Sequence, residues 1–276
     1  MKERQSTYNI QEASLGFESE VERLKLQATM GWTKEFRNLQ LYGLENGMRI
    51  IELGSGPGFV TEQLVNSLPD SQITALEIDE TLLNKAKKLL DNVPLSRLQF
   101  VQSSVYDTGL PDQSFDFAIA RLLFLHLHNP LLAAQEIYRV LKPGGKLVII
   151  DVDDGIFGAF NPDIHALPSV LKKVADYVAE KGGNRHIGRS LPRLLKNAGY
   201  IDVDIDAIIQ HSDILGIEGF KRRLDINRFA VFFKNGIINK QEYDQLEEAS
   251  HQINNSAEAY AMMTSITACG KKPELQ

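Results

Sequence analysis

The stretch that decides the fold reads Met48-Arg49-Ile50-Ile51-Glu52-Leu53-Gly54-Ser55-Gly56-Pro57-Gly58. A short apolar run ends in an acid, glycines then alternate at three positions, and a helical pattern follows with Val60, Leu64 and Leu68 on one face. This order predicts a strand, a tight turn and a helix. Glycine suits the turn because it lets the chain reverse sharply and lets the backbone approach a ligand closely. Since the first N–H groups of the helix point back at the turn, the loop is predicted to bind a ligand at the carboxyl end of a strand.

A second acid supports recognition of a nucleoside. The run from Gln72 to Asp79 reads as another buried strand that ends in acids. Glu77 follows Gly58 by about 20 residues, the offset at which a carboxylate meets ribose hydroxyls. A carboxylate suits this role because it accepts two hydrogen bonds from a vicinal diol, and Asp79 competes for it. The glycine spacing G-x-G-x-G differs from the dinucleotide fingerprint G-x-G-x-x-G, so a pyrophosphate reader is a poorer fit.

At these residues the sequence resembles the class I S-adenosylmethionine-dependent methyltransferases. The first motif of that family, D/E-x-G-x-G-x-G, corresponds to residues 52–58, its second acid to Glu77, and a third hallmark to the turn at residues 141–146. The resemblance covers residues 45–151 and is closest to the small-molecule branch, which includes quinone-biosynthesis-like and natural-product enzymes. It implies an α/β, doubly wound, mostly parallel seven-stranded sheet with helical lid segments, and S-adenosylmethionine as the cofactor.

The resemblance also implies which residues hold that cofactor. Glu52 would help to hold the amino end of its methionine, because a carboxylate at the end of an apolar run is costly unless it is paired. Glu77 would bind its ribose, and the glycine loop would surround it. Together with residues placed by their position in the chain, the predicted cofactor-binding residues are Gln27, Glu52, Gly54, Ser55, Gly56, Gly58, Glu77, Ile78, Ser104, Val105 and Arg121.

The predicted adenine pocket departs from the family pattern. After the third strand the family commonly has Gly-Asp-Ala, whose acid accepts a hydrogen bond from the adenine amino group, whereas this chain has Ser103, Ser104 and Val105. A serine oxygen can accept the same bond but is neutral, so Ser104 is expected to contribute less. Val105 offers only its backbone. Ile78 would give adenine an apolar face, although a core isoleucine produces the same pattern.

The run Ala120 to His128, after the fourth predicted strand, brings two further polar side chains to the same cleft. Arg121 ends a core strand, where a charge is costly without an anion; the cofactor's carboxylate and a protein acid are the two candidate partners. Because histidine ordinarily titrates near neutrality, His126 is the candidate general base, and a hydrogen-bonded structural histidine is the alternative. Gln27, on a predicted N-terminal helix, is expected to cover the cofactor.

Composition excludes several classes of protein. Hydrophobic residues make up 43% of the 276 residues, enough for a core, and a net charge of −6 argues against binding nucleic acid by phosphate neutralisation. The one cysteine, Cys269, excludes an internal disulfide and is predicted to be a buried thiol in a reducing, cytoplasmic setting. No apolar run is long enough to span a membrane, and no signal peptide is expected. No metal site is predicted, since the spacing of histidines and acids fits none.

Strand and helix patterns alternate along the chain, which predicts a single α/β domain. Three segments outside the core are expected to lie over the carboxyl edge of the sheet, either as a substrate lid or as structural additions. The predicted parts of the domain 1–276 are an N-terminal helical cap over 1–40, a cofactor-binding core over 41–151, lid or substrate segments over 152–198 and 213–256, and closing strands over 199–212 and 257–271.

The resemblance implies an enzyme that transfers the methyl group of S-adenosylmethionine to a small-molecule acceptor. The acceptor would attack through oxygen, nitrogen or carbon, by direct in-line displacement. Two alternatives remain open at this point. One is a non-catalytic protein that binds S-adenosylmethionine or S-adenosylhomocysteine, and the other is an NAD-dependent oxidoreductase, which the glycine spacing disfavours.

Overall fold

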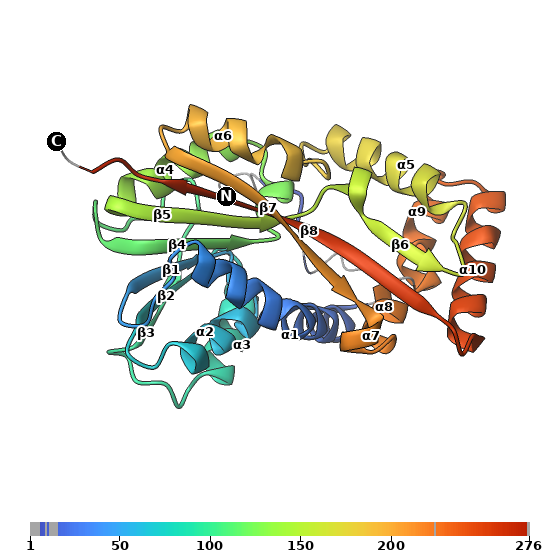
Figure 1. Cartoon of the computed structure of the whole chain (residues 1–276), viewed down its shortest axis with the longest axis horizontal. Coiled ribbons are helices and arrows are strands. Elements are labelled where there is room, and N and C mark those ends of the chain that lie inside the picture. Colours follow the sequence, from blue (N-terminus) through green and yellow to red (C-terminus); the bar gives the residue numbers. More distant parts are fainter. Residues whose placement is uncertain (1–5, 9, 11–15, 224, 275–276) are drawn as a thin grey trace.

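A mixed sheet of 8 strands forms the centre of the protein, and helices cover both of its faces (Figure 1). The computed structural model describes residues 6–8, 10, 16–223 and 225–274. Along the sheet the strands follow the order β3-β2-β1-β4-β5-β8-β6, and β7 pairs with β8. The strands are β1 (Arg49–Leu53), β2 (Gln72–Glu77), β3 (Leu98–Gln102), β4 (Phe115–Arg121), β5 (Leu141–Asp151), β6 (Gly158–Asn161), β7 (Ile201–His211) and β8 (Tyr260–Lys271).

The predicted α/β architecture is confirmed, with one strand more than expected. Strands β1 to β5 are parallel, whereas β8 runs antiparallel to β5, β6 and β7. The additional strand, β6, lies in a segment predicted to form part of the lid. Its four residues, Gly-Ala-Phe-Asn, are too few to show a strand periodicity. Because the strand order reverses between β1 and β4, a ligand cleft is expected at their carboxyl ends.

Helices pack on the two faces of the sheet through alternating strand residues. On one face, Ile51 and Ala118 contact the cluster that includes α4 and α6. On the other, Ile50 and Phe117 contact the cluster that includes α1 and α2. The longer helices are α1 (Phe17–Leu41), α2 (Phe59–Ser67), α3 (Glu80–Leu89), α4 (Pro130–Val140), α5 (Leu167–Glu180), α6 (Leu191–Asn197) and α10 (Lys240–Asn255).

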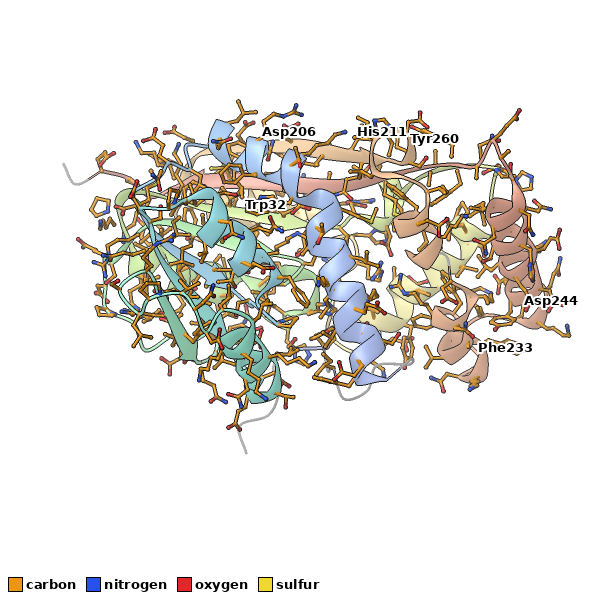
Figure 2. The ribbon with its side chains drawn as sticks, turned by 90° about the horizontal axis from the view of Figure 1, so that it is seen from below. Trp32, Asp206, His211, Phe233, Asp244 and Tyr260 are labelled. Atoms are coloured by element: carbon orange, nitrogen blue, oxygen red, sulfur yellow. The ribbon has the colours of Figure 1, made fainter. Side chains whose placement is uncertain are left out.

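Helix α1 continues to Leu41 because the apolar side chains of Phe36 and Leu39, near its end, pack into the core. Figure 2 shows α1 crossing the underside of the molecule, between the core helices and the segments that carry Phe233 and Asp244.

Cys269 is buried, as expected, in the hydrophobic cluster that includes α1 and α2. Burial raises the pKa of its thiol to about 12.

The segments predicted to form a lid have a hydrophobic cluster of their own. Residues of α5, such as Val170 and Val174, pack against Leu246 and Ile253 of α10. Within the predicted lid segment 152–198, α6 instead packs against α4 in the main core. The remaining short elements of this region are α7 (Ser212–Leu215), α8 (Glu218–Arg223), α9 (Ala230–Lys234) and the 3-10 turns η3 (Asp154–Ile156), η4 (Gly188–Ser190) and η5 (Ile226–Arg228).

Strand β8 joins this lid to the core. Its first residues, Tyr260 to Met263, pair with β6, and its later residues, Ile266 to Lys271, pair with β5. Strand β7 pairs along the opposite edge of β8 over most of that length. The sheet therefore continues from the cofactor-binding core into the lid, and Figure 1 shows β8 running between the two.

Gly58 sets the distance between the start of α2 and helix α3. Its φ of +87° is left-handed, and an added Cβ would lie 2.8 Å from the Cβ of Ala86. We expect Gly58→Ala to lower the free energy of unfolding by about 2–5 kcal/mol, because a left-handed alanine costs about 1–2 kcal/mol and overpacking about 1–3 kcal/mol. Denaturant unfolding measures this free energy. The control is Gly47→Ala, at φ +91° with no atom within 4 Å of the added Cβ; an equal loss there would contradict the packing explanation.

Candidate functional site

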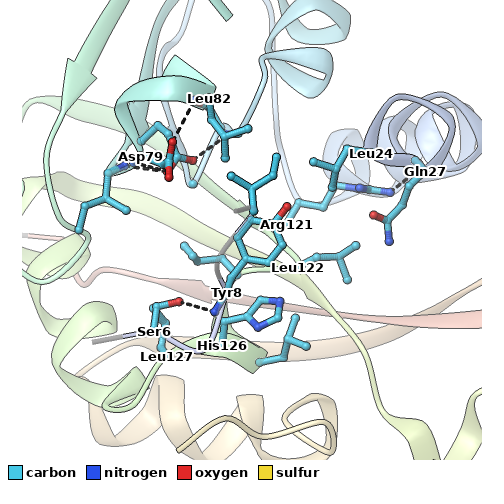
Figure 3. Close-up of a pocket in the computed structure, with 18 of the residues that line it drawn as sticks. Ser6, Tyr8, Leu24, Gln27, Asp79, Leu82, Arg121, Leu122, His126 and Leu127 are labelled. Carbon is cyan, nitrogen blue, oxygen red and sulfur yellow. Dashed lines mark hydrogen bonds between the residues drawn. The ribbon is translucent and has the colours of Figure 1, made fainter. Parts of the chain in front are cut away.

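A cavity of about 830 Å³ opens at the carboxyl ends of β1, β2 and β4, where the strand order of the sheet reverses. Its volume lies in the range typical of small-molecule sites. Core strands and the glycine loop line one part of it, and α1 and the lid segments line the rest. In Figure 3, Asp79 and Gln27 lie on opposite sides of this cavity, and His126 lies beside Tyr8.

The loop after β1 has the geometry that its glycines predict. Gly54 and Gly56 have φ values of +66° and +56°, in the region that favours glycine. The N–H groups of Gly54 and Ser55 donate to the carbonyl of Leu76 at 2.8 and 3.0 Å, which fixes the loop on β2. A Cβ added to Gly56 would have no atom within 4 Å, and Gly56 lines the cavity. The backbone is therefore open to close approach by a ligand.

Glu77, at the end of β2, organises that loop. Its Oε2 accepts a hydrogen bond from Gly56 N at 2.8 Å, and its Oε1 accepts from Ile78 N and Asp79 N, also at 2.8 Å. A carboxylate offers about four acceptor positions, so this arrangement leaves one to accept from a ligand hydroxyl. Burial raises the pKa of Glu77, and the three N–H donors oppose that rise.

Glu52, at the end of β1, is a buried acid that lines the cavity. Thr61 Oγ1 donates to its Oε2 at 2.6 Å. Burial raises the pKa of Glu52 to about 8, against the opposing effects of Thr61 and Arg121. A buried carboxyl of this kind favours a cationic partner, because a nearby positive charge stabilises its ionised form. Ser55 beside it also lines the cavity, and its buried Oγ has no hydrogen-bond partner within the described residues.

The predicted adenine pocket also contains an acid, Asp107. Ile78 is 56% exposed and lines the cavity, so it is not a core isoleucine. Ser104 and Val105 also line it, and Ser104 Oγ accepts from Tyr106 N at 3.2 Å. A tight turn brings Asp107 back beside Ser104, where it is exposed in the cavity lining. Asp107 could not be placed from its position in the sequence, because the turn is set by backbone pairing.

Gly58 differs from its predicted role. It does not line the cavity, and the Cβ that it lacks would collide with α3. The third glycine of the loop is therefore required by helix packing, and the prediction that it contacts the cofactor is not supported by its position.

Arg121 pairs with a protein acid. Its Nε donates to Glu35 Oε2 at 2.6 Å and its Nη2 to Glu35 Oε1 at 2.9 Å, while Nη2 also donates to the carbonyl of Gln27 at 2.8 Å. The ion pair was one of the two partners that the sequence left open. Both Arg121 and Gln27 line the cavity, and Arg121 Nη1 makes no hydrogen bond to the described part of the chain.

His126 lines the cavity but is not a histidine that titrates near neutrality. Burial, followed by the charges of Arg185 and Arg23, lowers its pKa to about 4. Its Nδ1 lies 2.9 Å from Thr7 Oγ1, so a tautomer protonated at Nδ1 donates to Thr7 and leaves Nε2 as a proton acceptor. The buried Asp151 accepts from Leu125 N at 3.1 Å and so holds the turn that carries His126. The expectation of ordinary histidine titration is thus wrong.

Several cavity residues were not found from the sequence. They come from segments far apart in the chain, and none stands in a motif, so no sequence signal marked them. These unpredicted lining residues include Tyr8, Arg23, Asp107, Phe157, Leu171, Val174, Arg185, Arg228, Phe229 and Phe232.

Within the described part of the chain, no helix is long and apolar enough to cross a bilayer. No group of three or more histidine, cysteine, aspartate or glutamate side chains is placed to hold a metal ion in the same part of the chain.

Comparison with known proteins identifies the domain. Residues 51–149 match a family model described as a methyltransferase domain. A ubiquinone/menaquinone biosynthesis C-methyltransferase of Vibrio campbellii is 26% identical over 171 residues, 57% of this chain and 66% of that protein. An uncharacterised methyltransferase of Schizosaccharomyces pombe is 30% identical over 111 residues, 38% of this chain and 40% of that protein. The chain thus spans about half of the length of the curated relatives that it matches.

Solved structures show the same fold. Phosphoethanolamine N-methyltransferase 2 of Haemonchus contortus, in complex with S-adenosyl-L-methionine, superposes with a TM-score of 0.58 at 20% identity, covering 88% of this chain and 53% of that chain. A putative sarcosine dimethylglycine methyltransferase from Galdieria sulphuraria gives a TM-score of 0.55 at 19% identity, covering 98% of this chain and 92% of that chain. The sheet, the glycine loop and the family match together give S-adenosylmethionine as the cofactor.

Gly56 provides the direct test of the loop. Gly56→Ala is expected to lower the affinity for S-adenosylhomocysteine by at least about tenfold, because its Cβ would project into the space that the ligand needs. Calorimetric titration measures the affinity. The matched control is Gly109→Ala, which has a similar φ of +68° and open space around the added Cβ but does not line the cavity. Equal affinities for the two variants would exclude the loop as the binding site.

Proposed function

We propose that this chain, which belongs to the class I S-adenosylmethionine-dependent methyltransferases, transfers a methyl group to a small-molecule acceptor bound in the same cavity. The observation that carries this proposal is the continuity of the cavity. Its lining runs from Glu52, Gly56 and Glu77 to lid residues such as Phe229, so a donor and an acceptor would lie side by side.

The residues at the strand ends fit the cofactor. We infer that Glu77 accepts from the ribose, that Ile78 packs on adenine, and that Ser104 or Asp107 accepts from the adenine amino group. Glu52 would pair with the α-ammonium group. Arg121 would donate through Nη1 to the carboxylate of the cofactor while keeping its ion pair with Glu35.

The chemistry of the donor sets what the protein must do. S-adenosylmethionine supplies a methyl group already activated on a positive sulfonium. The protein then gains most by holding the acceptor in line with that methyl, since positioning can supply several kcal/mol of the barrier. A base is required only when the acceptor must lose a proton. We infer that His126 contacts the acceptor as a neutral imidazole.

Relatives differ in the atom that they methylate. One is a C-methyltransferase of ubiquinone/menaquinone biosynthesis, and another is a phosphoethanolamine N-methyltransferase. We therefore propose an oxygen, nitrogen or carbon acceptor without transferring either substrate. The family match leaves no support for the NAD-dependent oxidoreductase. The remaining alternative is a non-catalytic protein that binds S-adenosylmethionine, and an activity assay distinguishes it from a methyltransferase.

The assay is a screen of small hydroxylated, amine and carboxylic acceptors with a methyl-labelled donor. Methylation of any acceptor by the wild type, with a large loss in Gly56→Ala and none in Gly109→Ala, supports the proposal. Tight binding of S-adenosylmethionine with no transfer to any acceptor, and no acceptor binding, would favour the non-catalytic alternative.

Glu52 should link cofactor binding to proton release. Its pKa of about 8 keeps it protonated at pH 6 to 7 in the cofactor-free protein, and an ammonium partner favours the ionised form. Binding of S-adenosylhomocysteine should then release up to one proton, and affinity should rise between pH 6 and 7.5. Calorimetry in buffers of different ionisation enthalpy measures this. Glu52→Gln should abolish the release, whereas the exposed control Glu45→Gln should keep it.

His126 should have only a small catalytic effect through proton transfer. General bases with well-matched pKa values contribute about 10²–10⁴-fold. Since the pKa of His126 is about 4, His126→Ala should lower the single-turnover rate by less than about 10²-fold. The profile of kcat/KM, which reports the free enzyme, should show no histidine ionisation between pH 5.5 and 8. A rise through pH 6.5 that disappears in the variant would contradict this expectation.

A further inference from the structure

Three arginines line the part of the cavity that the lid covers. Arg23 lies on α1, Arg185 lies between α5 and η4, and Arg228 lies in η5. They are about 160 and 40 residues apart in sequence, so only the fold brings them together. At the strand ends the lining instead combines the acids Glu52 and Glu77 with Arg121, which is paired with Glu35.

The carboxylates that hold two of these arginines lie behind the cavity wall. Arg185 binds Asp154 through Nε and through Nη2 at 2.9 Å, and Arg23 binds Glu20 through Nη2 at 2.6 Å. Neither Glu20 nor Asp154 is among the lining residues. Arg185 Nη1 makes no hydrogen bond to the described residues, so donors of a positioned guanidinium remain for a ligand.

The charges of these arginines act on one another and on the cavity. Burial, then Arg23 and Arg185, lower the pKa of Arg228, while Glu20 and Asp225 oppose that change. The pKa of His126 is lowered by burial and then by Arg185 and Arg23. The three guanidinium groups therefore lie close enough to one another, and two of them to His126, for their charges to interact. Positive charges that interact in this way are stabilised by an anion.

Apolar side chains surround the same space. They come from the β6 region and the lid helices, and give the region an aromatic and aliphatic wall beside its positive charge. These lining residues are Phe157, Leu171, Val174, Phe229 and Phe232.

We propose that the methyl acceptor is a small organic acid whose oxyanion binds Arg185 and Arg228 and whose apolar body packs on the aromatic wall. This inference rests on the proposed function, because it names the class of acceptor for that cavity. A carboxylate and a phosphate monoester share the chemistry that guanidinium groups recognise by paired hydrogen bonds. Arg23, on α1 between the two regions, adds to the positive field.

The cofactor's own carboxylate is the competing anion. Arg121 and Gln27 line the cavity on the side of β4 and α1, and Arg121 contributes to the field at Glu52. Arg185 and Arg228 belong instead to the segments predicted to form the lid. The following test separates the two assignments.

The experiment compares three probes on the protein with and without S-adenosylhomocysteine, by calorimetry at low salt. The probes are 2-naphthoate, 2-naphthyl phosphate and the neutral 2-naphthamide. At least one acid should bind about 10- to 100-fold more tightly than the amide, the range for a hydrogen bond between charged groups. The acid that binds more tightly shows whether the site prefers a carboxylate or a phosphate.

Variants then locate the effect. Arg228→Gln should lower the affinity for the preferred acid about tenfold or more, leave naphthamide unchanged, and keep the affinity for S-adenosylhomocysteine within about twofold. Arg228→Lys should recover part of the loss, which a merely structural role would not explain. Arg189→Gln is the matched control, since Arg189 pairs with Asp153, its side chain is 59% exposed and it does not line the cavity.

Three results would overturn the inference: equal binding of acid and amide, no binding of any probe at millimolar concentration, or a loss in Arg228→Gln confined to S-adenosylhomocysteine. The last would assign the arginine to the cofactor's carboxylate. Failure of the wild type to bind S-adenosylhomocysteine would instead reject the proposed function. In that case the titrations of the probes in the absence of S-adenosylhomocysteine would still show whether the cavity prefers acids.

Discussion

The carboxylate of Glu77 is the constraint on which the binding site depends. It accepts backbone N–H groups from Gly56 on one side and from Ile78 and Asp79 on the other. One side chain therefore joins the glycine loop after β1 to the turn after β2, whose Asp79 caps α3. Buried donors left unpaired cost about 1–3 kcal/mol each, so the acid stabilises the loop before any ligand binds. The acceptor position that these three bonds leave over is the one proposed for the ribose.

The buried ion pairs around the cavity place the covering segments. Glu35 of α1 is almost fully buried and binds Arg121 at the end of β4 through two hydrogen bonds, which fixes the long helix across the cavity. Asp154 and Arg185 make a comparable pair within the lid segment. Removing one partner of such a pair is strongly destabilising, because a buried charge is left uncompensated. Each pair therefore fixes the position of a side chain that also lines the cavity.

The sequence predicted the parts of this site that depend on local sequence patterns. Three alternating glycines after an apolar run, and an acid at the end of the next strand, were sufficient to place Gly56 and Glu77 at the cavity. Gly58 was assigned to the ligand because a packing glycine and a binding glycine look alike until the neighbouring helix is seen. The pKa of His126 and the grouping of Arg185 with Arg228 depend on burial and on distant segments, which local patterns do not contain. Strand β6 was missed because its pairing partner, β8, lies about 100 residues away.

The division of charge in the cavity follows from how the two halves are built. Parallel strands end at one edge, and the acids at those ends are the groups proposed to meet the ammonium and ribose diol of the cofactor. The lid has no such edge, so its polar groups are side chains from α1, the α5–η4 connection and η5. Strand β8 pairs with both β5 and β6 and thus couples these halves through one backbone. Changes in the lid can therefore alter acceptor recognition while the acids at the strand ends keep their geometry, because those acids are held by local backbone contacts of β1 and β2.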